Sequence, residues 1–183
     1  MRVQRLASAD DVALDEQPGL VEPTDDVVAG LAALLVDAVA DGASVGFLSA
    51  LTPADAAQWW TCTLRSPGSI TWVARTDDDR VVGCVRLTPA APPNASHRAD
   101  VSKLLVHRAA RGQRVASLLM ASVEAEARRL GRTLLLLDTQ TGSPAERIYA
   151  GWGWEPYGAM ADHAMQPDGR LDATTFMLKR LPP

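Results

Sequence analysis

The sequence predicts a mixed α+β (α/β) domain with a central, largely antiparallel sheet. Its length of 183 residues is that of one domain, and 47% of these are hydrophobic, which is enough for a buried core. Helical periodicity and short β-rich runs occupy separate segments, in the order strand, two helices, three strands, helix, strand, helix and one or two final strands. Since no repeat or second domain is visible, we expect a single domain over residues 1–183.

The first 26 residues form the least regular part of the chain. A short strand is predicted over Val3–Leu6. Residues 7–26 then hold seven acidic side chains and no basic one, and they are interrupted by Pro18, Gly19 and Pro23. We therefore expect an acidic, irregular arm after the first strand.

Two helices are expected next. Apolar residues at helical spacing run over residues 28–39, with Thr24 or Asp25 as the cap and Gly42 as the stop. Threonine and proline at Thr52-Pro53 begin the second helix, which ends before Pro67. Its tryptophans, Trp59 and Trp60, are expected in the core, with a pocket lining as the alternative.

Three strands follow the helices. Residues 70–75 and 80–87 are β-rich and are joined by a polar hairpin turn at 76–79. The prolines of residues 89–94 predict a loop. A third strand over residues 97–106 leads directly into the Arg111-Gly112 turn.

The last part of the chain alternates between helix and strand. A long amphipathic helix with apolar positions from Ala116 to Leu130 ends at Gly131, and a four-leucine strand covers residues 133–138. Ser143-Pro144-Ala145-Glu146 combines a cap, a first-turn proline and a capping-box glutamate. A turn at Asp168-Gly169 precedes a final strand over residues 173–179.

Composition excludes several classes of protein. A net charge of −4 argues against nucleic acid as the main partner, and no apolar run approaches the length of a membrane span. Without a secretory signal we expect a cytoplasmic protein. Cys62 and Cys84 are then expected to be reduced and packed in the interior, and the three histidines lack metal-ligand spacing, so we expect no metal.

The turn between the third of these strands and the long helix is the strongest functional signal. Free N–H groups at the start of a helix, together with its dipole, form an anion site. Arg111 and Arg114 add positive charge there. An ordinary strand-to-helix turn with two solvated arginines remains the alternative.

This segment resembles the pyrophosphate-binding loop of the GNAT N-acetyltransferases, whose pattern is Arg/Gln-x-x-Gly-x-Gly/Ala. Arg111 and Ala116 match the pattern, whereas Arg114 stands where the family usually has its first glycine. We expect a helical backbone at Arg114, so that its N–H still faces the phosphates. The later segments Ser143–Tyr149 and Gly153-Trp154 also resemble the family.

Within the family, the pattern is closest to the tabtoxin-resistance type. The similarity includes residues 41–48, Arg98–Val101 with Lys103-Leu104, Leu137–Thr139 and Pro167–Leu171. It covers about residues 28–181. The resemblance implies the GNAT fold, with a sheet of six to seven strands flanked by about four helices.

The resemblance implies transfer of the acetyl group of acetyl-CoA to a primary amine, by direct attack in a ternary complex and without a metal. Asp100 and Asp138 match acidic positions that handle the amine, and Tyr149 matches the tyrosine that protonates the CoA sulfur. Two converging carboxylates would raise the pKa of one of them. The residues expected to bind the cofactor are Leu104, Leu105, Val106, Arg111, Gly112, Gln113, Arg114, Val115, Ala116, Ser117 and Tyr149.

The expected acceptor is a small-molecule amine, with an amino-acid-like toxin or antibiotic as one candidate; a homodimer is left open. Two alternatives remain. One is an acetyltransferase that acts on a protein or peptide amine. The other is a CoA-binding regulatory module with little turnover, suggested by the arginine at position 114.

Overall fold

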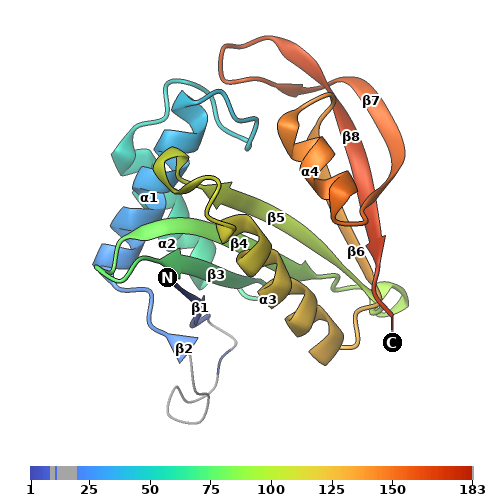
Figure 1. Ribbon diagram of the computed structural model, residues 1–183, viewed down its shortest axis with the longest axis horizontal. Coiled ribbons are helices and arrows are strands. Elements are labelled where there is room, and N and C mark those ends of the chain that lie inside the picture. The colour runs from blue at the N-terminus through green and yellow to red at the C-terminus, as the bar shows by residue number, and fades with distance from the viewer. Residues whose placement is uncertain (9–10, 12–19, 183) are drawn as a thin grey trace.

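The structure is a computed structural model, and it describes residues 1–8, 11 and 20–182. One eight-stranded mixed sheet with helices on both faces confirms the predicted α+β class (Figure 1). The strands run in the order β2-β1-β3-β4-β5-β6-β8-β7, and only the pairs β1–β2 and β5–β6 are parallel. Their bounds are β1 Arg2–Leu6, β2 Leu20–Val21, β3 Ile70–Arg75, β4 Val81–Pro89, β5 Arg98–Val106, β6 Leu134–Gln140, β7 Glu155–Met165 and β8 Leu171–Arg180.

The helices lie close to the positions that the periodicity predicts. Their bounds are α1 Asp25–Ala40, α2 Pro53–Arg65, α3 Val115–Arg129 and α4 Pro144–Gly151, and two 3-10 turns, η2 Pro93–Ala95 and η3 Arg108–Ala110, flank β5. No helix among the described residues is long and apolar enough to cross a membrane.

The described sheet has eight strands, whereas six to seven were expected. The short strand β2 pairs in parallel with β1 at Arg5 and Leu6, so the end of the acidic arm adds to the sheet. The middle of the arm, residues 9–10 and 12–19, lies outside the described residues. Asp11 is not merely solvated, because it accepts a 2.6 Å bond from the Arg5 guanidinium.

Side-chain caps begin two of the helices as the sequence predicts. Thr52 and Asp55 form a reciprocal capping box at α2. At α4 the Ser143 hydroxyl accepts from the Glu146 N–H at 3.1 Å. The Glu146 carboxylate, however, accepts from the Gly142 N–H and not from Ser143, so the expected reciprocal box is incomplete.

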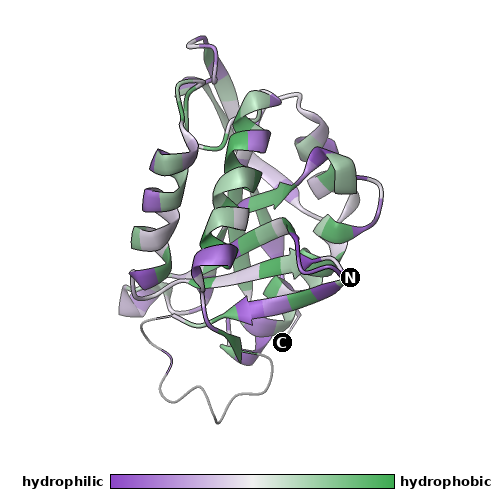
Figure 2. Ribbon diagram, turned by 90° about the vertical axis from the view of Figure 1, so that its left-hand side faces the viewer, coloured by the Kyte–Doolittle hydropathy of each residue, from purple (hydrophilic) through white to green (hydrophobic). Residues whose placement is uncertain are grey.

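Two hydrophobic clusters pack on opposite faces of the sheet. The cluster under α3 includes Val85 and Leu119, and the cluster under α1 and α2 includes Trp60 and Cys84. Neighbouring residues of β4 thus point to opposite faces, as strand geometry requires. The helices of Figure 2 alternate between hydrophilic and hydrophobic residues along their length, which is typical of helices that cover a core on one side.

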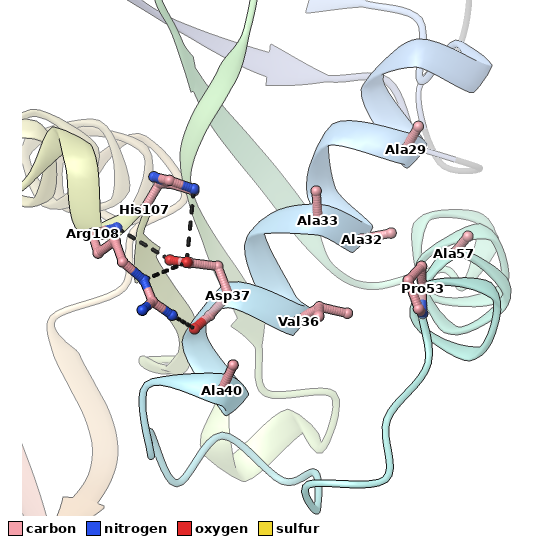
Figure 3. Close-up of a pocket in the computed structure, with 10 residues that line it drawn as sticks. All are labelled: Ala29, Ala32, Ala33, Val36, Asp37, Ala40, Pro53, Ala57, His107 and Arg108. Carbon is pink, nitrogen blue, oxygen red and sulfur yellow. Dashed lines mark hydrogen bonds and ion pairs between the residues drawn. The ribbon is translucent and has the colours of Figure 1, made fainter.

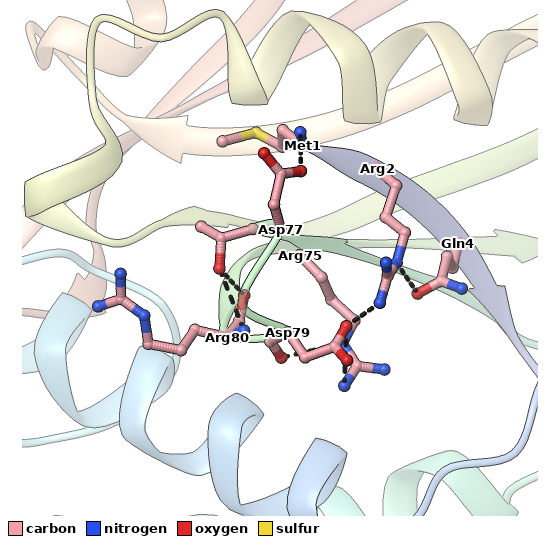
Figure 4. A network of polar contacts seen from close by, with 8 residues as sticks. Met1, Arg2, Gln4, Arg75, Asp77, Asp79 and Arg80 are labelled. Carbon is pink, nitrogen blue, oxygen red and sulfur yellow. Dashed lines mark hydrogen bonds and ion pairs between the residues drawn. The ribbon is translucent and has the colours of Figure 1, made fainter.

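The β3–β4 hairpin turn is tied to the start of β1 by surface charges (Figure 4). The N-terminal amine bonds to the Asp77 carboxylate at 2.9 Å, and Arg2 pairs with Asp79. Since the two aspartates are largely exposed, solvent screens these pairs and they contribute little to stability. The network aligns β1 at the edge of β3 and has no part in the functional site.

The two cysteines differ in their surroundings. Cys84 is buried, and burial raises the pKa of its thiol to about 12. Cys62 is exposed on α2, so the expectation that both cysteines are interior is wrong for Cys62. Position 62 falls on the solvent side of α2, whose buried face is formed by Ala56, Trp60 and Leu64.

Candidate active site

The sheet opens between its two central parallel strands. β5 and β6 pair only over Arg98–Asp100 and Leu134–Leu136, although β5 continues to Val106 and β6 to Gln140. Beyond Asp100, β5 is hydrogen-bonded only to β4, and β6 only to β8. The two facing strand edges therefore keep free backbone groups that can bind an extended ligand.

A loop holds the two halves of the sheet together above this opening. The loop between α1 and α2 reaches the β7–β8 turn, where the Ser49 N–H donates to the Pro167 carbonyl at 3.0 Å. The Ser49 hydroxyl donates to the same carbonyl. Both segments lie at the same end of the molecule in Figure 1. The Ser49–Pro167 tie thus links the α1–α2 loop to the turn between the last two strands.

The predicted carboxylates lie on this α1–α2 face. Asp100 sits between Ala99 and Val101, and Asp138 follows Leu137; all three apolar neighbours are buried under α3. By strand alternation both carboxylates point to the opposite face. The sequence suggested that Asp138 is the last residue of its strand. This is wrong, because β6 continues for two more residues, to Gln140.

Charge and burial act together on Asp100. Partial burial raises the pKa of its carboxyl above the usual range, Arg98 opposes this, and the Asp138 charge raises the pKa further. The direction is the one expected from two converging carboxylates, but burial is the larger cause. The effect of Asp138 shows that the two groups are within electrostatic reach of each other.

The coupling between the carboxylates can be measured directly. Asp138→Asn should lower the pKa of Asp100, because it removes the repulsion that disfavours the charged form. Arg98→Gln, the matched control, should raise this pKa because it removes an attraction. Carbon-13 NMR titration of the aspartate carboxyls reports both shifts. An Asp100 pKa that is unchanged in Asp138→Asn would contradict the proximity of the two groups.

Tyr149 approaches the opening from the other face. Its ring packs against the cluster under α3 and lies 6.0 Å from the rings of both Trp152 and Trp154. Burial, and secondarily the Asp138 charge, raises the pKa of the phenol to about 12. Its proton is therefore retained at neutral pH. The opening thus has carboxylates on the α1–α2 side and a phenol on the α3 side.

The turn after β5 presents backbone N–H groups, as expected. Among the described residues, no side chain caps α3. The Leu118 N–H is the first N–H of this helix that donates to a backbone carbonyl, that of Arg114. Uncapped N–H groups and the helix dipole favour a bound anion. The turn lies directly after the open part of β5, so an anion held here would be adjacent to the opening.

Arg114 is not helical, contrary to expectation. It is the N-cap of α3 and has φ 61° and ψ 16°, the left-handed conformation that glycine adopts most easily. This explains why a glycine is usual at the position in the GNAT pattern. A side chain in this conformation costs about 1–2 kcal/mol.

Two substitutions can measure the free-energy cost of the left-handed conformation at Arg114. Arg114→Gly and Arg114→Ala both remove the charge, but only glycine relieves the left-handed strain. The free energy of unfolding should therefore be about 1 kcal/mol higher for Arg114→Gly than for Arg114→Ala. Urea unfolding of both variants measures the difference. Equal stabilities would contradict the left-handed backbone.

Arg111, the other predicted cation of the turn, has an acidic partner. Its guanidinium lies 2.7 Å from the Asp41 carboxylate at the end of α1. Arg108 pairs with Asp37 on the same helix at 2.6 Å. The turn is thus fixed to α1 by two ion pairs, and Arg111 would have to share its charge between Asp41 and a ligand.

An open pocket lies beside these ion pairs, between α1 and α2 (Figure 3). Its lining consists of small apolar side chains of the two helices together with Asp37, His107 and Arg108. None of the predicted site residues contributes to it. His107 instead accepts from the Ala109 N–H at 3.2 Å and acts as the N-cap of η3.

Two cations near the carboxylates were not among the predicted site residues. Arg86 on β4 and Lys103 on β5 are both partly buried beside the opening. A lysine directly before the apolar Leu104-Leu105 run was the available signal, because it breaks the alternation expected of a central strand. No cluster of metal-ligand type occurs among the described residues.

This geometry is consistent with a group-transfer site. β5 and β6 separate after Asp100, and acid–base side chains lie near this separation on both faces of the sheet. The model of the Acetyltransferase (GNAT) family matches residues 37–154, which is more than half of the chain. The chain therefore belongs to the GNAT family and is an acetyltransferase.

Solved structures of similar fold agree with this assignment. A ribosomal-protein-alanine N-acetyltransferase from Brucella melitensis is 26% identical, with a TM-score of 0.71 over 86% of this chain and 96% of that one. A phosphinothricin acetyltransferase from Sinorhizobium meliloti, in complex with acetyl-CoA, is 20% identical, with a TM-score of 0.69 over 86% of each chain. A putative acetyltransferase from Salmonella typhimurium with its cofactor acetyl-CoA is 19% identical, with a TM-score of 0.70 over 87% and 91% of the two chains.

Proposed function

We propose that this protein transfers the acetyl group of acetyl-CoA to the primary amine of a small molecule, by direct attack in a ternary complex. The separation of β5 from β6 after Asp100 is the observation that carries the proposal. This separation would let a ligand lie between the two strands, with Tyr149 on one side and the two carboxylates on the other. A donor and an acceptor could then meet from opposite faces, without an acetylated enzyme as intermediate.

The coenzyme would occupy the α3 side. The backbone of Leu104, Leu105 and Val106, on the open edge of β5, would bind the pantetheine arm, and one of its N–H groups would stabilise the oxyanion. The turn and first helical residues from Arg111 to Ser117 would hold the pyrophosphate through their N–H groups. Phosphates at the helix start would thereby place the thioester beside the carboxylates.

The carboxylates would act on the acceptor. Two negative charges attract an ammonium group, and Asp100 would accept its proton directly or through water before attack. The raised pKa of Asp100 makes it a stronger base than an ordinary aspartate. Asp138 would keep the acceptor nitrogen in place and maintain that raised pKa.

Tyr149 would assist the departing thiolate. A phenol with a pKa of about 12 is a much weaker acid than a thiol with a pKa near 8.5, so complete proton transfer to sulfur is uphill. The phenol would instead donate a hydrogen bond to the sulfur as negative charge develops there, and the proton released by the amine would complete the neutralisation.

Tyr149→Phe should therefore lower the rate of acetyl transfer by about 10–100-fold and leave acetyl-CoA affinity within about twofold, because only the developing charge loses its partner. Stopped-flow measurement of CoA release and calorimetric titration of acetyl-CoA test the two parts. Tyr157→Phe, on the exposed strand β7, is the matched control. An unchanged rate in Tyr149→Phe would remove the phenol from the mechanism.

The acceptor would be a small molecule. The Ser49–Pro167 tie would narrow the acceptor face and would thereby favour a small molecule over a folded protein. The resemblance to the tabtoxin-resistance type and the phosphinothricin acetyltransferase neighbour point the same way, towards an amino-acid-like toxin or antibiotic. A second candidate is acetylation of a protein N-terminus, favoured by the 26% identical ribosomal-protein-alanine N-acetyltransferase.

A two-part experiment tests the proposal. Calorimetry should detect binding of acetyl-CoA, and CoA release should exceed background with small amines but not with peptides that begin with alanine. Turnover of the peptides alone would favour the second candidate. Tight acetyl-CoA binding without turnover of any amine would instead identify a regulatory module. If neither acetyl-CoA nor CoA binds, the proposal is wrong.

Other expectations stay predictions. The chain acting as one domain, a cytoplasmic location and a homodimer are each without a direct test so far. Sedimentation at several protein concentrations would measure the oligomeric state.

A further inference from the structure

Two basic side chains share the acceptor face with Asp100 and Asp138. Arg86 follows Cys84 by two positions on β4, and the Cys84 side chain belongs to the cluster under α1 and α2. By alternation Arg86 points to that same face, opposite the flanking Val85 and Leu87. It pairs across the strands with Ser102, directly beside Lys103.

A bulge turns Lys103 towards the same face. Cys84 pairs with Leu105 and Arg86 with Ser102, so β5 has one residue more than β4 in this interval. Lys103 has φ 53°, and its carbonyl accepts from the Cys84 thiol at 3.3 Å. Such bulges redirect side chains next to functional sites.

The Lys103 ammonium lies over two aromatic rings, one on α2 and one in the loop before it. Its nitrogen lies 5.9 Å from the centre of the Phe47 ring and 5.4 Å from that of Trp59. These two rings are themselves in edge contact at 5.2 Å. The rings hold the ammonium in place but do not neutralise it.

Neither cation is in direct contact with an acidic side chain in the part of the chain that the structure describes. No ion pair or hydrogen bond to the Lys103 ammonium or the Arg86 guanidinium occurs there, and Arg86 Nε is buried without any hydrogen-bond partner. Burial lowers the pKa of both groups, and Arg86 lowers that of Lys103 further, whereas the Asp138 charge raises it in part. Asp138 offsets the burial and repulsion at Lys103 only in part, so an anion bound beside these two adjacent, partly desolvated positive charges would stabilise them.

We propose that Lys103 and Arg86 form a subsite for a carboxylate of the acceptor, so that the acceptor is a small amine that also carries a carboxylate, as amino acids do. This inference rests on the proposed acetyl transfer. The acceptor amine lies at Asp100 and Asp138, and its carboxylate lies at the neighbouring cation pair. One face of the sheet thus offers acidic groups to one end of a zwitterion and basic groups to the other.

The test compares matched acceptors. CoA release is measured with the common L-amino acids and with the carboxamide of each, which keeps the amine but lacks the negative charge. The wild-type protein should show a kcat/KM at least about tenfold higher for the best amino acid than for its carboxamide. Lys103→Gln should abolish this preference by raising the KM of the amino acid, and Arg86→Gln should weaken it.

Three controls separate binding of the carboxylate from other effects. Lys103→Arg should retain the preference because it keeps the charge. Lys179→Gln, at the only other lysine of the chain, should change nothing in the preference. The KM of acetyl-CoA should stay within about twofold in every variant, since the coenzyme lies on the other face.

The outcomes distinguish this inference from the function on which it rests. Carboxamides or other uncharged amines that are acetylated as well as the amino acids would overturn the inference and leave acetyl transfer intact. A raised KM for acetyl-CoA, with the preference unchanged in Lys103→Gln, would assign the cations to the coenzyme and also overturn it. Acetyl-CoA binding without turnover of any acceptor would overturn both.

Discussion

Replacing both Asp100 and Asp138 with asparagine should lower the rate of acetyl transfer by about 10²–10⁴-fold at neutral pH, because no group would then remain in place to accept the amine proton. The two positions face the same opening, and the Asp138 charge raises the pKa of Asp100. The single variants should each lose less than the double variant. CoA release at saturating acetyl-CoA, with the fastest acceptor found, measures the effect.

The pH dependence of the wild-type rate follows from the same carboxylates. Because the pKa of Asp100 is raised, its carboxylate takes up a proton at a higher pH than an ordinary aspartate does. Activity should therefore be lost as the pH falls through that raised pKa. Asp26→Asn, exposed in the first turn of α1, is the matched control and should not alter the profile. A wild-type rate and profile in the double variant would reduce both aspartates to structural residues.

Gly83→Ala should weaken acetyl-CoA binding and destabilise the fold by about 1–3 kcal/mol. A Cβ at Gly83 would lie 2.9 Å from Val115, 3.0 Å from Leu119 and 3.1 Å from the Leu105 carbonyl oxygen. Val115 begins α3, and Leu105 belongs to the open edge of β5. The added methyl group would thus displace the two elements proposed to hold the pyrophosphate and the pantetheine arm.

The matched control for this prediction is Gly151→Ala. A Cβ at Gly151, in the last turn of α4, meets nothing within 4 Å. This variant should unfold at the wild-type temperature or slightly above it, because alanine is the better helix former. Calorimetric unfolding and titration with acetyl-CoA compare the two variants. Wild-type affinity and stability in the Gly83→Ala variant would mean that α3 does not need this close contact with β4.

Much of the fold could be predicted from the sequence because its signals are local. Thr52-Pro53 and Ser143-Pro144 begin α2 and α4, and the four leucines of β6 lie at the centre of the sheet. Capping and periodicity act within a few residues, so the sequence contains them completely. The strand β2 was missed because two residues, Leu20 and Val21, carry no periodicity.

The site was predictable only in part. Asp100, Asp138 and Tyr149 were selected through the family pattern. Lys103 lay in a segment that resembles the family but was given no role, and Arg86 lay in none. Lys103 reaches the acceptor face through a bulge, and a bulge depends on how two strands pair over a distance of about twenty residues. Such a register is set by the sheet as a whole.

The sequence by itself determined the elements, their order and the family to which the chain belongs, because each depends on local chemistry or on a pattern of residues in a row. Only the tertiary structure decided that β5 and β6 separate after Asp100, that Arg114 is left-handed and that Arg111 pairs with Asp41. These features arise where segments distant in the chain meet. Their physical reason is packing and pairing across the sheet, which no single segment encodes.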